Sequence, residues 1–190
     1  MSRQKLFKII VIAIFLALTT GCSLKAPSYS TNFETVNNLK EAGLLQAKVD
    51  IESKANAIQK FQIRGGVFFS PYGNNFDNYV ESIIENTLKQ AGLLDVKSDI
   101  KIYCNLITLD VDTSSFSTGV TNISGNFKVT KNNTVIFSKT ISVQEIFNSH
   151  FVGAIAVENG ANSFAKSSVK LVDKFLNDKD FMNSLTKDKK

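Results

Sequence analysis

FDNYVESIIENTLKQAGLLDVKSDIKIYCNL, residues 76–106, holds the two clearest periodic patterns of this chain. Apolar side chains recur at three- and four-residue spacing over 76–91, which predicts an amphipathic helix that ends at Gly92. The pattern then changes to alternation, which predicts a strand over 100–111 with Cys104 on its apolar face. A helix followed by a strand with one apolar face predicts a sheet that is covered by helices on that side.

The rest of the chain supplies more strands and a second long helix. The predicted strands cover 44–53, 57–69, 126–130 and 135–143, and the predicted helix covers 159–176. Gly65-Gly66 suggests a bulge in the second of these strands, and Asn132-Asn133 suggests a hairpin turn between the last two. This order predicts an α+β fold with one mainly antiparallel sheet and two main helices packed on one face.

The first 21 residues have the features of a secretory signal peptide. Arg3, Lys5 and Lys8 precede the unbroken apolar run 9–18. These ten apolar residues would rise about 15 Å in a helix, half of a hydrocarbon core of about 30 Å. The run therefore predicts a signal peptide over 1–21 that is removed, rather than a membrane-spanning anchor.

The residues around Cys22 predict where the signal is cut. Leu18-Thr19-Thr20-Gly21-Cys22 resembles the lipobox of bacterial lipoproteins, with Thr19 at the position that usually holds leucine. In that family the cysteine sulfur receives a diacylglycerol, and the chain is cut on the amino side of the cysteine. The resemblance therefore implies cleavage between Gly21 and Cys22 and a lipid on Cys22. Ser23, in place of aspartate, implies transfer to the outer membrane.

A disulfide between Cys22 and Cys104 is the alternative to lipidation. These are the only two cysteines, and an exported protein enters an oxidising compartment. If Cys22 carries a lipid, Cys104 is instead expected to be a small buried apolar residue of its strand.

The mature chain is expected to have three parts. Residues 22–35 contain Pro27 and five Ser or Thr residues and lack helical periodicity, which predicts a flexible tether. Fully extended, such a tether would span at most about 50 Å. Residues 36–185 are expected to form a single α+β periplasmic domain, and 186–190 a charged tail.

The charge balance bears on possible partners. The formal net charge is +5, but without residues 1–21 the chain has 19 basic and 17 acidic side chains. Binding to nucleic acid needs a concentrated basic surface, which this mixed composition does not predict. The expected partners are the membrane, through the N-terminal lipid, and an envelope protein.

The motifs of common catalytic and metal sites are missing from the sequence. His150 is the only histidine, so a multi-histidine metal site is impossible, and no Gly-x-Ser-x-Gly elbow occurs. We predict no catalytic residue, metal or cofactor, and expect that the chain is not an enzyme. Two alternatives stay open. One is a periplasmic hydrolase that uses His150 or the carboxylates of Asp110 and Asp112. The other is a carrier that holds a lipid or glycan in a cavity of a few hundred cubic ångströms.

Several segments spread over 36–185 carry a family resemblance. They are Ile63-Arg64-Gly65, Ser70-Pro71-Tyr72-Gly73, Ala91-Gly92-Leu93, Phe127-Lys128-Val129, and the stretches 151–161 and 176–181. Together they resemble a group of proteobacterial lipoproteins with no settled biochemical activity. The resemblance implies a lipid-anchored protein of the outer membrane that faces the periplasm. The predicted anchor, beside a domain without recognisable catalytic motifs, leads us to expect a non-enzymatic binding or assembly role in the cell envelope.

An interaction patch is predicted from two of these segments. It comprises Phe151, Val152, Gly153, Pro71 and Tyr72. The apolar segment that starts at Phe151 would be a docking surface if it is exposed, and part of the core if it is buried.

Overall fold

The computed structural model describes residues 23–50, 57–73 and 75–186. The predicted signal peptide, Cys22 and residues 187–190 of the predicted tail lie outside these ranges. The strands are β1 Ser23–Lys25, β2 Lys48–Val49, β3 Lys60–Ile63, β4 Gly66–Phe69, β5 Ile100–Asp112, β6 Thr118–Lys131 and β7 Thr134–Asn148. The helices are α2 Phe33–Glu41, α3 Phe76–Ala91, α4 Gly153–Leu176 and α5 Lys179–Leu185.

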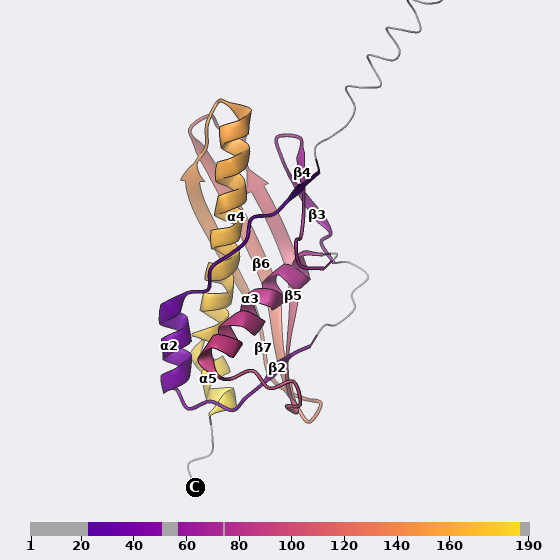
Figure 1. Ribbon diagram of the computed structural model, residues 1–190, viewed down its shortest axis with the longest axis vertical. Coiled ribbons are helices and arrows are strands. Elements are labelled where there is room, and N and C mark those ends of the chain that lie inside the picture. Colours follow the sequence, from indigo (N-terminus) through magenta and orange to yellow (C-terminus); the bar gives the residue numbers. More distant parts are fainter. Residues whose placement is uncertain (1–22, 51–56, 74, 187–190) are drawn as a thin grey trace, which may run out of the picture.

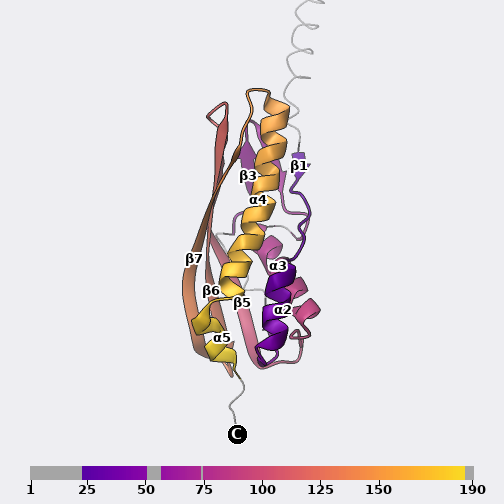
Figure 2. The same ribbon diagram turned by 90° about the vertical axis from the view of Figure 1, so that its left-hand side faces the viewer.

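The strands form two sheets (Figure 1). The larger has the order β2-β5-β6-β7, in which β5, β6 and β7 are antiparallel and β2 adds a short parallel edge. The smaller has the order β1-β4-β3. Figure 2 shows that the helices and the smaller sheet lie on one face of the larger sheet. The predicted α+β class, with helices on a single face, is confirmed.

The prediction of a single sheet is wrong, because the segment 57–69 is not one strand. The chain reverses at Arg64 and Gly65, whose φ angles of 44° and 83° suit a tight hairpin turn, and β3 pairs with β4. The glycines expected to form a bulge therefore form the turn and the start of β4. Of the strand expected over 44–53, the described part contains only the two residues of β2.

The local signals of the remaining elements are confirmed with changed boundaries. α3 covers the predicted range and ends at Gly92, which has a φ of 74°. The turn between β6 and β7 is at Asn132-Asn133, where both φ angles are positive. α4 starts at Gly153 rather than at 159. Its first turn is mostly exposed and buries only Ala156, so it shows no apolar period in the sequence.

Two groups of aromatic rings fill the space between the larger sheet and the helices. Phe127 of β6 stacks on Phe175 of α4, with 4.4 Å between the ring centroids. Phe164 of α4 contacts Phe61 of β3 and Tyr79 of α3, each at 4.9 Å. These contacts join α4 to both sheets and to α3.

Residues 23–32, which we call the N-terminal strap, lie along the domain. β1 pairs in parallel with β4, with Ser23 opposite Val67. Farther along, the hydroxyl of Tyr79 donates a hydrogen bond of 2.7 Å to the carbonyl oxygen of Pro27. Burial raises the pKa of Tyr79, so its phenol remains a neutral donor.

The far end of the strap is joined to α4. The amide nitrogen Nδ2 of Asn32 donates to Oδ2 of Asp173 at 2.9 Å, and the ring of Tyr29 packs against two other tyrosines. The prediction of a flexible tether over 22–35 is therefore wrong from Ser23 onward, and the domain starts there. The polar composition of the segment gave no sign of partners that lie far away in the sequence.

Candidate functional site

The structure separates the two halves of the predicted interaction patch. Phe151 is 70% exposed and Val152 is 39% exposed, in the loop between β7 and α4, and Gly153 begins α4. Pro71 and Tyr72 follow β4 instead, where the ring of Tyr72 packs on the strap. The segment at Phe151 is thus an exposed surface rather than core, and Pro71-Tyr72 belongs to different surroundings.

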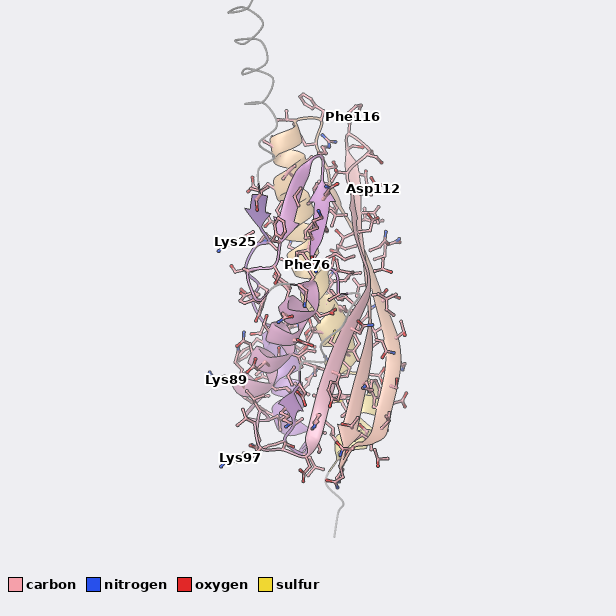
Figure 3. The ribbon with its side chains drawn as sticks, turned by 90° about the vertical axis from the view of Figure 1, so that its right-hand side faces the viewer. Lys25, Phe76, Lys89, Lys97, Asp112 and Phe116 are labelled. Atoms are coloured by element: carbon pink, nitrogen blue, oxygen red, sulfur yellow. The ribbon has the colours of Figure 1, made fainter. Side chains whose placement is uncertain are left out.

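Other apolar side chains extend this exposed surface. Phe116, in the loop between β5 and β6, is 73% exposed and lies at the end of the molecule, as Figure 3 shows. Ile155, in the first turn of α4, is 41% exposed. The two loops meet, since the N–H of Ser149 donates to the carbonyl oxygen of Ser117 at 3.0 Å. We call Phe116, Phe151, Val152 and Ile155 the apolar tip.

Arg64 holds the loops of the tip together. From the turn between β3 and β4, its Nε and Nη2 donate to the carbonyl oxygen of Thr113 at 3.2 and 2.8 Å. Its Nη1 donates to the carbonyl oxygen of Phe151 at 3.2 Å. The planar guanidinium thus joins three loops through three separate nitrogen atoms, whereas a lysine would offer only one nitrogen.

The start of α4 departs from the usual chemistry of a helix N-terminus. The N-cap is Val152, without a side-chain cap, where Ser, Thr, Asp or Asn is preferred. Nδ1 of His150 accepts the N–H of Val152 at 3.0 Å, and the imidazole stacks on the ring of Phe151. An apolar residue stands here where a polar cap is preferred. This departure indicates that the surface at the start of α4 has a role other than contact with solvent.

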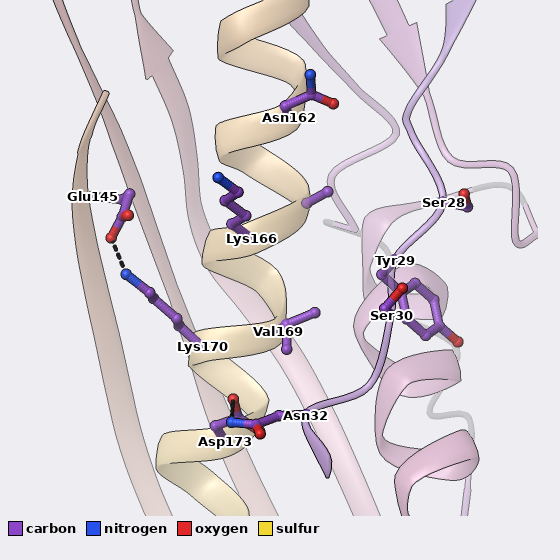
Figure 4. Close-up of a pocket in the computed structure, with 11 residues that line it drawn as sticks. Ser28, Tyr29, Ser30, Asn32, Glu145, Asn162, Lys166, Val169, Lys170 and Asp173 are labelled. Atoms are coloured by element: carbon purple, nitrogen blue, oxygen red, sulfur yellow. Dashed lines mark hydrogen bonds and ion pairs between the residues drawn. The ribbon is translucent and has the colours of Figure 1, made fainter. Parts of the chain in front are cut away.

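A groove of about 730 Å³ lies along α4, between the strap and β7 (Figure 4). It is lined by Ser28, Tyr29, Ser30, Asn32, Glu145, Asn162, Ala165, Lys166, Val169, Lys170 and Asp173. Lys170 forms an ion pair with Glu145, whereas Lys166 has no ion-pair partner among the described residues. A second hollow of about 410 Å³ shares Glu145, Asn162 and Lys166 with the first, so the groove continues beside β7.

The residues considered for a hydrolase make local contacts. His150 orients the loop before α4, as described above. Oδ1 of Asp112 accepts the N–H of Ser114 at 2.7 Å, and this hydrogen bond lowers the pKa of the carboxyl. Asp110 lies opposite Asn122 in the pairing of β5 with β6. Among residues 23–50, 57–73 and 75–186, no cluster of His, Cys, Asp and Glu that could hold a metal ion is found.

The comparison with known proteins shows a similarity of fold. No family model matches the chain, and no curated protein matches its sequence. The chain is similar to the crystal structure of a Xanthomonas campestris protein of family DUF330, with a TM-score of 0.53 and 14% identity over 82% of this chain and 95% of that one. It is less similar to a proposed lipoprotein from Caulobacter crescentus, with a TM-score of 0.46 and 10% identity over 76% of this chain and 91% of that one. The first likeness shows a shared fold, and the second is too low to add to it.

The sequence analysis missed the strap and the role of Arg64. Leu24 and Ala26 alternate with polar residues, and both contact the core, which is a weak strand signal inside the predicted tether. Arg64 gives no such signal, because its acceptors are backbone carbonyls of distant loops.

Proposed function

We propose that this chain is a lipid-anchored lipoprotein of the outer membrane that faces the periplasm and acts as a non-enzymatic binding or assembly component of the envelope. The observation that carries the proposal is the lipobox-like sequence that ends at Cys22, directly before the first residue of β1. No helix of the described part has both the length and the apolar character needed to cross a membrane.

The surroundings of Cys104 support lipidation over a disulfide. Cys104 is fully buried in β5, opposite Phe127 of β6. Cys22 directly precedes Ser23, which pairs with Val67 in the smaller sheet, whereas Cys104 belongs to the larger sheet. A disulfide requires the two Cα atoms to lie within about 7 Å, so the N-terminal cysteine would have to enter the core.

Replacing Cys22 by serine is expected to abolish incorporation of a labelled fatty acid and to release the protein from the membrane fraction. The reason is that serine lacks the sulfur atom that would accept the diacylglycerol, and the acyl chains account for the anchoring. The measurement is metabolic labelling followed by fractionation of the envelope. Cys104→Ser is the matched control and should stay labelled. Label on the Cys22→Ser variant, or unlabelled wild-type protein in the soluble fraction, would contradict the proposal.

The groove along α4 favours a second candidate function, the binding of a polar ligand such as a glycan or a lipid headgroup. Its volume suits a small ligand, and Lys166, which lines it, forms no ion pair with a described acidic side chain. Solvent extraction of the mature protein, followed by mass spectrometry, is expected to recover bound ligand. Lys166→Glu should reduce the recovered amount by about tenfold, because a charge-assisted hydrogen bond is replaced by repulsion. Lys97→Glu, in the exposed loop before β5, is the control. Equal recovery from both variants, or none from the wild type, would rule this candidate out.

A further inference from the structure

The apolar tip is exposed, and the segments that form it are almost without charge. Residues 113–127 and 146–157 contain no ionisable side chain other than that of His150. The nearby charge of Arg64 is engaged by two backbone carbonyl groups. Exposed apolar side chains that gather in neighbouring loops of a folded domain are typical of a contact with another molecule or with a membrane.

The start of the strap lies at the same end of the molecule. Ser23 pairs with Val67, which follows Gly66 at the start of β4, directly after the turn that carries Arg64 (Figure 1). The Cα atom of Cys22 can lie no farther than about 3.8 Å from that of Ser23. A lipid on Cys22 would therefore sit close to the apolar tip.

The strap also limits how the domain can turn on its anchor. A long tether would let the domain leave the lipid surface in any orientation. Instead, the strap is joined to the domain from Ser23 to Asn32, with hydrogen bonds at Pro27 and Asn32. A lipid on Cys22 would thus fix which end of the molecule faces the membrane, and that end carries Phe116 and Phe151.

We propose that the apolar tip is a second membrane contact. Phe116, Phe151, Val152 and Ile155 enter the boundary between headgroups and acyl chains of the membrane that holds the lipid on Cys22. The opposite end of the molecule, where Figure 3 places Lys97, points away from that membrane, and Val96 precedes Lys97 in the chain. This inference rests on the proposed lipid anchor and adds a defined orientation to it. Amphipathic surfaces that bind lipid in this way bury their apolar side chains by about 5–10 Å.

The natural sequence contains no tryptophan, so a single introduced tryptophan reports its own surroundings. Phe116→Trp places it at the tip and Val96→Trp at the far end, and both replaced side chains are 73% exposed. The two lipidated full-length mature proteins are reconstituted in vesicles of phosphatidylethanolamine and phosphatidylglycerol with brominated acyl chains. We expect the fluorescence of the Phe116→Trp variant to shift to the blue and to be quenched at least about threefold more than that of the Val96→Trp variant.

Equal quenching of the two variants would overturn the inference. A blue shift at position 116 without quenching by bromine, together with a doubled mass in solution, would assign the tip to a second copy of the chain and would also overturn it. Fatty-acid labelling of the same preparations separates the two proposals. If the labelling shows no lipid on Cys22, the proposed anchor fails. The unlipidated Phe116→Trp protein is then mixed with the same vesicles, and its quenching by bromine still shows whether the apolar tip contacts the membrane.

Discussion

Replacing Phe164 with alanine is expected to lower the free energy of unfolding by about 3–5 kcal/mol. Phe164 is fully buried at the point where α4 meets α3 and the smaller sheet. Its ring centroid lies 4.9 Å from those of Phe61 and Tyr79 and 5.2 Å from that of Phe76. Alanine would leave a cavity among these rings. It would also remove the edge-to-face contact with Phe76 and the tilted contacts with Phe61 and Tyr79.

Urea denaturation followed by circular dichroism measures this effect. Phe33→Ala is the matched control, because Phe33 is 71% exposed at the start of α2. The control should change the free energy of unfolding by less than about 0.5 kcal/mol. A loss below about 1 kcal/mol for Phe164→Ala would contradict the packing described at this junction. Because Tyr79 also holds the strap, proteolysis near residues 23–32 should become faster in the Phe164→Ala variant.

A loss of about 2–4 kcal/mol is expected for Asp77→Ala. Asp77 is only 4% exposed in the first turn of α3, and its Oδ1 accepts the N–H of Leu106 at 2.7 Å. The pairing of β5 with β6 shifts register between Leu106 and Thr108. The carboxylate therefore satisfies a buried donor at a bulge, and alanine would leave that donor without its acceptor.

Asp77→Asn provides the control for this prediction. The asparagine side chain still offers an acceptor oxygen, so most of the stability should be kept, with a loss of about 1 kcal/mol. The negative charge also favours the N-terminus of α3, which accounts for a small remaining difference. If thermal and urea denaturation show the same large loss for both variants, the hydrogen bond to Leu106 is not the cause.

Much of the larger sheet could be predicted because its signals are local. The alternation over 100–111 and the turn at Asn132-Asn133 lie within single segments, and β5, β6 and β7 follow one another as hairpins. The helix over 76–91 has both its apolar period and its terminal glycine in the sequence. Such elements need no knowledge of distant residues.

The strap and the second sheet could not be predicted in this way. Asn32 and Asp173 form their hydrogen bond across 141 positions, and β1 pairs with a strand that follows it by more than forty residues. A segment with one proline and several serines has the same composition whether it is a free linker or a docked edge strand. The glycines at 65 and 66 fit both a bulge and a turn, and only the tertiary pairing of β3 with β4 decides between them.

The candidate site was predicted in part for similar reasons. The apolar run at Phe151 is visible in the sequence, although its exposure is not. Phe116 stands alone among serines and gives no pattern. The join of their loops through Arg64 depends on backbone carbonyl groups, which every residue has. The tip thus becomes recognisable only when the loops are placed together.

The mass of the N-terminal peptide of the mature protein, purified from envelopes, tests the central claim most directly. The account predicts a chain that begins at Cys22 and carries the added mass of a diacylglycerol on its sulfur. A peptide with an unmodified Cys22, or one that still contains the leader, would contradict it.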